Sequence, residues 1–207
     1  MEPPATHSLE IPFGLSQGGL EAADGLSATI GTQLSVSTEL KKTGAGTITL
    51  TANNTGLTGG SKIEAGTLQV NHNGALGAGT ITLAGGKLQA GNGARTLTNT
   101  ITATALTTSE VVSPTNNNLT LNGNLTGVGT IWKTGAYSVY LGGDNSAFAG
   151  VFSNRQSNLF FNTANSGSCA GRVGQHGGQS IRDELRDQRY DSIWFVWRHD
   201  RHAPWRL

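Results

Sequence analysis

A repeat of short strands at fixed spacing predicts that this chain is all-β and folds as a right-handed parallel β-helix. The pentapeptide Gly-Thr-Ile-Thr-Leu at 46–50 is echoed at 66–70 and again at 86–90, two steps of twenty residues. In each echo, apolar residues follow the glycine at alternate positions, which is the pattern of a half-buried strand. One such unit cannot bury its apolar face alone, so we expect successive units to stack as the coils of a solenoid.

The expected strands pair in register between coils that lie about 4.8 Å apart. The inward ladder is expected to contain Ile48, Leu68 and Leu88, with Leu50, Val70 and Ala90 beside it, while Thr47, Thr67 and Lys87 face outward. A second row keeps the same period at Ile63, Leu83 and Ala103. Two strands in each period leave no room for a helix. Corners that need positive φ are expected at the glycine pairs 59–60 and 85–86 and at Asn53, Asn54, Asn71 and Asn73.

Taken in order, residues 1–26 are expected to form an irregular lead-in. They lack the basic n-region and apolar h-region of a secretory signal, so we expect an internal fragment of an exported rod, or a reading frame begun at an internal start. Residues 27–165 are expected to form the β-helix, about seven coils in a rod near 30 Å long. Alternation begins at Ala28, Ile30, Leu34 and Val36, blurs after Ala90 and resumes until about Asn165.

The composition changes in residues 166–207. All 26 threonines lie at or before Thr163, whereas three of the four tryptophans lie in the last 44 residues. One hypothesis is that a frameshift ended the gene early and that this tail is out-of-frame sequence. The alternative is a genuine helical cap, because Ile181, Leu185 and Ile193 with interleaved charges allow an amphipathic helix.

Composition also limits the classes of function. Thirty glycines, 13% charged residues and 6% aromatic residues are typical of an extracellular β-solenoid with a Thr-, Asn- and Ser-rich surface. The single cysteine, Cys169, excludes an internal disulfide framework. A formal net charge of +1 gives no electrostatic case for nucleic acid or an anionic membrane as a partner.

A set of residues between Leu40 and Leu68 forms a recognisable motif: Leu40, Lys42, Thr43, Gly44, Gly46, Ile48, Leu50, Asn54, Gly59, Gly60, Ile63, Ala65, Gly66 and Leu68. This motif resembles the passenger-associated transport repeat of bacterial autotransporters, which are secreted by the type V route. The family often places an aromatic residue before the Gly-Gly pair, where this chain has Leu57, with Gly56 as a possible insertion.

A weaker second copy lies ninety-one residues further on. It contains Lys133, Thr134, Gly135, Ala136, Leu141, Asn145, Gly150 and Leu159, with Phe148 restoring the aromatic residue. The resemblance implies a surface-displayed or secreted passenger rod, a signal peptide upstream and an outer-membrane translocator barrel downstream, neither of which is present in this sequence. It also implies a host surface or glycan as a possible target.

The residues that could carry chemistry are few. The acids between residues 40 and 165 are Glu64, Glu110 and Asp144, which we expect to be isolated and solvated, so no calcium site or catalytic pair is predicted. Lys42 and Lys133 recur at equivalent positions, and we expect each stem to lie along a coil with its ammonium in water.

The remaining candidates have more ordinary interpretations, and the sequence predicts no catalytic residue, cofactor or metal site. Gly-Ala-Leu-Gly-Ala-Gly at 74–79 lacks the spacing of a phosphate loop, so corner glycines are expected. The other residues considered are His199, Asp200 and His202 as one edge of a metal site, an exposed His72, Cys169 as a nucleophile, and the Asn-x-Thr triplets at Asn53, Asn118 and Asn124.

The sequence therefore predicts a non-enzymatic structural segment of an autotransporter passenger, a β-helix stalk that supports export and adhesion. The alternative is a β-helix carbohydrate-active enzyme or a glycan-binding module. Clustered Asp and aromatic residues along one face would favour that alternative, and here the aromatic residues gather only in the second copy, namely Tyr137, Tyr140, Phe148, Phe152, Phe160 and Phe161.

Overall fold

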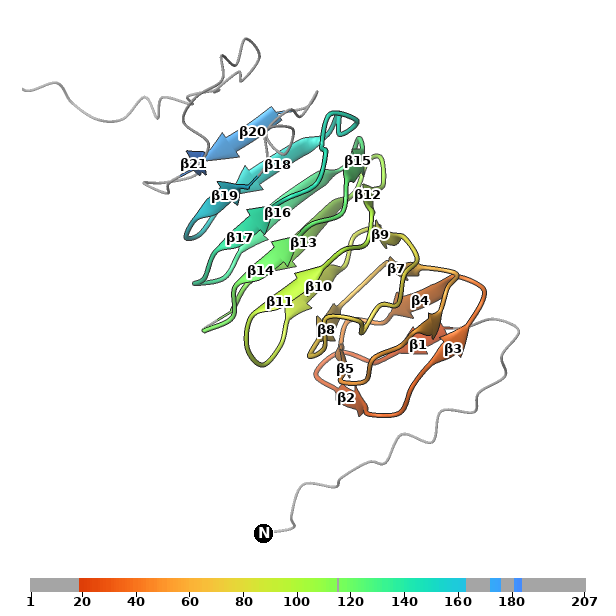
Figure 1. Cartoon of the computed structure of the whole chain (residues 1–207). Helices are drawn as coiled ribbons and strands as arrows, with labels where there is room; N and C mark the ends of the chain where they lie inside the picture. The colour runs from red at the N-terminus through yellow and green to blue at the C-terminus, as the bar shows by residue number, and fades with distance from the viewer. Residues whose placement is uncertain (1–18, 115, 163–171, 176–180, 184–207) are drawn as a thin grey trace, which may run out of the picture.

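The computed structural model describes residues 19–114, 116–162, 172–175 and 181–183. Over these residues the chain winds as a parallel β-solenoid of about seven turns and contains no helix. Figure 1 shows the strands stacked along one axis, from the red N-terminal coil to the blue strands near residue 180. The all-β class and the solenoid architecture predicted from the twenty-residue repeat are confirmed.

Two long sheets form most of the stack. Sheet A contains β1 (Gly19–Glu21), β4 (Leu40–Thr43), β7 (Ser61–Ile63), β9 (Ile81–Leu83), β12 (Ile101–Ala103) and β15 (Leu125–Gly127). Sheet B contains β2 (Ser27–Ile30), β5 (Thr47–Leu50), β8 (Thr67–Val70), β10 (Lys87–Ala90), β13 (Thr108–Val112), β16 (Thr130–Thr134), β18 (Val151–Asn154) and β20 (Arg172–Gln175). A strand of sheet A precedes one of sheet B in each coil up to β15 and β16, and of these two sheets only sheet B continues beyond that point.

A third face completes each coil, and the sequence did not predict it. In the first two coils it is sheet C, formed by β3 (Ser35–Val36) and β6 (Gly56–Leu57). From the fourth coil onward it is sheet D, formed by β11 (Arg95–Leu97), β14 (Leu119–Leu121), β17 (Val139–Leu141), β19 (Leu159–Phe161) and β21 (Ile181–Asp183). These strands are only two or three residues long, and the sequence analysis counted two strands in each period rather than three.

The predicted registers of the main ladders are confirmed. Leu68 pairs with Ile48 on one side and with Leu88 on the other, and all three side chains are buried. Ile63, Leu83 and Ala103 form the second inward row in sheet A. A shift of one residue would turn each of these side chains to the solvent, so the alternation fixes the register.

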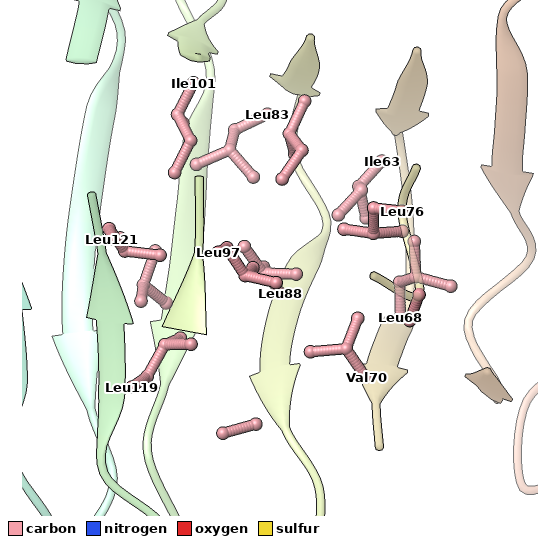
Figure 2. Close-up of a cluster of buried hydrophobic side chains, with 14 of the residues drawn as sticks. Ile63, Leu68, Val70, Leu76, Leu83, Leu88, Leu97, Ile101, Leu119 and Leu121 are labelled. Carbon is pink, nitrogen blue, oxygen red and sulfur yellow. The ribbon is translucent and has the colours of Figure 1, made fainter. Parts of the chain in front are cut away.

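The core is one continuous apolar column enclosed by the three faces. In Figure 2, Leu68 and Leu88 of sheet B lie in the same interior as Ile63 and Leu83 of sheet A and Leu97 of sheet D. Burying a leucine or isoleucine side chain contributes roughly 1.5–3 kcal/mol. Because each coil contributes only a few such side chains to the core, the stability of any coil depends on its contacts with the neighbouring coils.

Both ends of the chain differ from the predicted boundaries. Strand β1 falls inside the segment 1–26 that was expected to be irregular, and it pairs with β4 because Leu20 can bury itself beneath the sheet. Two strands fall inside the predicted tail, 166–207, where the backbones of β20 and β21 continue sheets B and D. The other residues of the tail, with Cys169 and the expected helix around Leu185 and Ile193, lie outside the described residues.

One glycine of each expected pair has a positive φ, whereas the asparagines expected at such corners, Asn53, Asn54, Asn71 and Asn73, do not. Gly60 and Gly85 have φ of +84° and +119°, in the region that side chains rarely adopt. A Cβ on Gly60 would also lie 2.6 Å from the carbonyl oxygen of Thr80 in the next coil. Position 60 therefore requires glycine for two reasons, the positive φ and the close approach of the next coil.

The inward ladder generates a stability prediction. Leu68→Ala should lower the free energy of unfolding by about 2–5 kcal/mol, because Leu68 is buried between two coils and the cavity cannot collapse easily. Thr67→Ala, on the outer face of the same strand, is the matched control and should change stability by less than about 0.5 kcal/mol. Urea denaturation followed by circular dichroism measures both, and equal effects of the two substitutions would contradict the assigned faces.

Candidate functional site

The two lysines that recur in the sequence occupy the interior of the solenoid. Lys42 in β4 and Lys133 in β16 are 1% and 0% exposed, and they rank among the largest fully buried side chains. The expectation that their ammonium groups reach water is therefore wrong. The alternation did indicate this burial, because residues two positions apart in a strand face the same side of the sheet. Lys42 lies two positions after buried Leu40, and Lys133 lies two positions after buried Ile131.

The Lys42 ammonium is held by three backbone carbonyls at the corner between sheets A and B. Its Nζ donates to the carbonyl oxygens of Thr43 at 2.7 Å and Gly44 at 2.8 Å in its own coil. It also donates to Ala65 at 3.1 Å, 23 residues further along and therefore in the next coil. One side chain thus links two coils.

The Lys133 ammonium has a similar arrangement at the corner between sheets B and D, with one acceptor at a different position. Its Nζ donates to the carbonyl oxygens of Gly135 at 3.0 Å and Tyr137 at 2.5 Å. The third acceptor is the carbonyl of Gln156 at 2.5 Å, again 23 residues further along. Both lysines donate to the carbonyls of residues i+2 and i+23 and differ in the remaining acceptor, and we call each arrangement a lysine corner.

A glycine two residues after each lysine makes the corner possible. Gly44 and Gly135 have φ of +70° and +86°. A Cβ on Gly44 would lie 2.3 Å from the carbonyl oxygen of Ala22, and one on Gly135 would lie 2.2 Å from that of Ser113. The Lys-Thr-Gly sequence therefore combines an inward cation with a backbone turn that only glycine fits.

Hydrogen bonding and burial act in opposite directions on the charge of these lysines. Three acceptors for each Nζ match the three donors of an ammonium, whereas a neutral amine would have only two N–H groups. Burial away from water lowers the pKa of Lys133 from its ordinary value of 10.5 to about 8. Burial also lowers the pKa of Lys42, with the nearby Glu21 carboxylate acting in the opposite direction.

A buried asparagine follows each lysine corner. The side-chain oxygen of Asn54 accepts from the amide of Leu34, and its Nδ2 donates to the carbonyl of Ala75. The side-chain oxygen of Asn145 likewise accepts from the amide of Leu125, 20 residues earlier. Sequence analysis placed Asn54 at a turn but did not predict that it would link coils, although its recurrence in both copies was a signal.

The second copy lies on different faces of the solenoid from the first. Lys42 belongs to sheet A and Lys133 to sheet B, and the strands that follow them, β5 and β17, belong to sheets B and D. The 91 positions from Lys42 to Lys133 therefore correspond to four complete coils plus one step from a face of the solenoid to the next. The lysine corner is a local unit that the solenoid accepts at either of two edges.

The three acids considered as catalytic candidates do not come together. Glu64 pairs with Lys62 at 2.8 Å, which lowers the pKa of Glu64, and Glu110 pairs with Lys87 at 3.2 Å. Asp144 accepts a hydrogen bond from the amide of Ser146. Glu64 and Glu110 are thus paired on the outer surface rather than isolated there. No group of three or more metal-ligating side chains occurs among the described residues.

The other candidates lie at corners or outside the described residues. His72 is exposed, and its Nδ1 accepts from the amide of Gly74. In the 74–79 segment, Ala75 and Leu76 are buried and Gly77 has a φ of +61°, so these glycines form a corner as expected. His199, Asp200, His202 and Cys169 fall outside the described ranges.

The aromatic residues of the second copy divide between the core and the surface. Phe148, Phe152 and Phe161 are buried. Tyr140 and Phe160 face outward on sheet D and stack with ring centroids 4.7 Å apart and planes inclined by 10°. On sheet B the Arg155 guanidinium lies 3.4 Å from the ring centroid of Trp132, a cation–π contact that covers one face of the indole.

These features define a parallel β-solenoid whose specialised positions link coils. No helix among the described residues has the length and apolar character needed to span a membrane. No family model and no solved structure matches the chain. A curated protein that it resembles is the adhesin BmaC autotransporter of Brucella suis biovar 1 (strain 1330), with 36% identity over 125 residues.

The matched region covers 59% of this chain but only 4% of that relative. The similarity and the β-solenoid together fit an autotransporter passenger domain, and the resemblance inferred from the repeat is confirmed.

The lysine corner generates a prediction about stability. Lys133→Met should lower the free energy of unfolding by about 1–3 kcal/mol, because three buried carbonyls lose their donor while the apolar volume is kept. Lys62→Met, at a partly exposed position of sheet A, is the control and should cost less than about 1 kcal/mol. Thermal and urea unfolding would measure the difference, and a Lys133→Met variant as stable as the parent protein would contradict this role.

A second prediction concerns pH. Folded Lys133 releases its proton near pH 8, whereas the unfolded chain does so near 10.5, so between these values the unfolded state binds more protons. Stability of the parent protein relative to Lys133→Met should therefore rise with pH across this window, by at most about 1.4 kcal/mol per pH unit. The cost of the buried charge is fully present below pH 8. Urea denaturation at pH 7.5, 8.5 and 9.5 tests the sign, and a relative stability that falls with pH would contradict it.

Proposed function

We propose that this chain is a non-enzymatic structural segment of an autotransporter passenger, a β-solenoid stalk that supports export and adhesion. The observation that carries the proposal is the unbroken pairing of eight strands in sheet B, from β2 to β20. Such a stack is a rod whose length grows with each repeat and whose interior is filled by its own side chains. The specialised residues of the described coils, Lys42, Lys133, Asn54 and Asn145, all bond to backbone groups of the rod itself.

Location and partners follow from the same proposal. The relative is named an autotransporter adhesin, which supports a cell-surface or secreted location for the parent of this chain. The parent would then require an outer-membrane translocator as its export partner. A host surface or glycan is the proposed target of the parent, and nucleic acid is not a proposed partner.

The proposal can be tested with the purified chain immobilised at controlled density. A stalk segment should give an elongated particle in small-angle X-ray scattering and weak binding to cultured host cells when presented alone. Insertion of residues 19–162 into an unrelated passenger should extend that passenger while its export is retained. Leu68→Asp, which places a carboxylate in the core, is the matched unfolded control. A compact particle, or loss of export with the parent insert and the control alike, would contradict the stalk.

A glycan-binding module is the second candidate, and the outward aromatic residues favour it. Tyr140, Phe160 and Trp132 lie on the outer faces of sheets B and D, while most outward positions in the earlier coils hold Thr, Gln or Lys. Aromatic rings beside polar groups suit sugar rings. The stacked pair and the Arg155 contact already cover part of these ring faces, so we rank this function below the stalk.

Absence of turnover is the prediction that separates the stalk from a β-helix enzyme. The purified chain should release no product from pectin-like or other polyanionic glycans, with or without calcium, because Glu64 and Glu110 are each paired with a lysine and lie in different coils. Product detection by ultraviolet absorbance and calcium titration by calorimetry are the measurements. Saturable micromolar calcium binding, or any lyase product, would favour the enzymatic alternative.

A further inference from the structure

The third coil closes without a strand on its third face. Sheet C ends at β6 and sheet D begins at β11, and residues 71–80, between β8 and β9, form turns instead (Figure 1). Strand β11 therefore has no strand beside it on this side. The amide of Thr96 in β11 donates to the side-chain oxygen Oδ1 of Asn73 at 3.1 Å, so a side chain supplies the acceptor that a strand would have supplied.

The same loop places a base beside the residue that follows Asn73. The backbone amide of Gly74 donates to Nδ1 of His72 at 2.9 Å. An accepting Nδ1 belongs to the neutral imidazole, which can take up a proton at that atom. A Cβ on Gly74 would lie 2.0 Å from Oδ1 of Asn53, so the position after Asn73 requires glycine.

These two contacts act on the two groups that react when an Asn-Gly pair closes to a succinimide. In that reaction the backbone nitrogen of the glycine loses its proton and attacks Cγ of the asparagine. His72 accepts a hydrogen bond from that very N–H, and the Thr96 amide polarises the Cγ carbonyl and stabilises negative charge on Oδ1. The proton lies in the peptide plane, whereas the attack uses the nitrogen orbital perpendicular to it, so the base does not block the attack.

Backbone hydrogen bonds hold the reacting groups in place. The amide of Asn54 donates to the carbonyl of Gly74 at 2.9 Å, and the amide of Ala75 donates to the carbonyl of His72 at 3.1 Å. Ala75 is buried, whereas His72 and Asn73 are exposed to water. The loop is therefore fixed from the inside and open on the outside, and fixing the base relative to the nucleophile lowers the entropic part of a barrier.

Two other Asn-Gly pairs in the chain lack this arrangement. Asn92 and Asn122 are also exposed and are also followed by glycine, but the residues before them are Gly91 and Leu121, which cannot take up a proton. The amide of Gly93 donates to the side-chain oxygen of Asn117, an amide oxygen that is not a base at neutral pH. These pairs are internal controls for the role of His72.

We propose that Asn73 is a self-modification site, at which the chain converts this asparagine to aspartate with His72 as the general base. The bond from the Gly74 nitrogen to Cγ forms and the bond from Cγ to Nδ2 breaks. The proton taken by His72 passes to Nδ2, which leaves as ammonia. One water molecule then opens the succinimide, so the net change is asparagine plus water to aspartate plus ammonia.

The Thr96 amide also selects the product. A succinimide can open at either carbonyl, and because Thr96 polarises the Cγ carbonyl, water attacks Cγ and leaves an ordinary aspartate rather than an isoaspartate. The new carboxylate still accepts from the Thr96 amide, in a charge-assisted hydrogen bond. The reaction lowers the formal net charge of the chain from +1 to 0 and keeps the link between the third and fourth coils.

Peptide mapping of the purified full chain tests the proposal, because trypsin places the three Asn-Gly pairs on separate peptides, 63–87, 88–95 and 96–133. During incubation at neutral pH in heavy-oxygen water, Asn73 should convert several-fold faster than Asn92 or Asn122 and gain one labelled oxygen. Hydroxylamine, which reacts with succinimides, should modify the chain at Asn73 first. In urea the three sites should react at similar rates.

His72→Gln is the matched variant, since glutamine keeps an oxygen acceptor but is no base at neutral pH. It should slow Asn73 to the rate of Asn92 and leave the thermal unfolding of this exposed corner unchanged. Equal rates at the three sites of the folded parent chain, an Asn73 rate unaffected by His72→Gln, or an Asn73 that reacts faster in urea than when folded would each overturn the proposal. Isoaspartate as the main product of the folded chain would also overturn it.

Discussion

Parallel stacking in register is the constraint on which this structure depends. Each coil supplies the hydrogen-bond partners and the apolar contacts of the next, so Leu68 has a place only between Ile48 and Leu88. Any inward side chain must therefore fit two neighbours at once, one coil below and one above. This requirement explains why residues of similar size follow one another along an inward row, as Ile48, Leu68 and Leu88 do.

Corners are where this constraint is hardest to satisfy. At a corner the chain leaves one sheet before it joins the next, and carbonyls that point inward have no strand beside them. In the Lys42 and Lys133 corners an ammonium supplies three donors at one point, and one acceptor in each case comes from the following coil. The cost of burying a charge without an acidic partner is offset by satisfying three carbonyls that water does not reach.

Sequence periodicity predicted the two inward rows and located the second copy, but it missed the third face and the burial of the recurring lysines. The rows through Ile48 and Ile63 were predictable because period-two alternation and a twenty-residue spacing agree with each other. The burial of Lys42 was missed because the charge of the side chain was given more weight than its position. Lys42 lies two residues after inward-facing Leu40, and that position was the correct indicator. The third face was missed because two strands rather than three were expected in each period, and strands such as β3 are only two residues long. The placement of the second copy one face further on required the coil count, which the irregular stretch after Ala90 obscured.

Two side chains reverse the usual partition: a lysine that lies within a strand and extends its ammonium into a corner, and an exposed leucine at a corner. A residue within a strand is committed to the inside or the outside by its neighbours two positions away, whereas a corner residue such as Leu106 is free of that alternation. A change at a corner can therefore alter what the rod exposes, or how two coils are joined, without disturbing any ladder. The strands on the faces of the solenoid therefore maintain the fold. Residues at its corners can change, and can form a new contact, without loss of the fold.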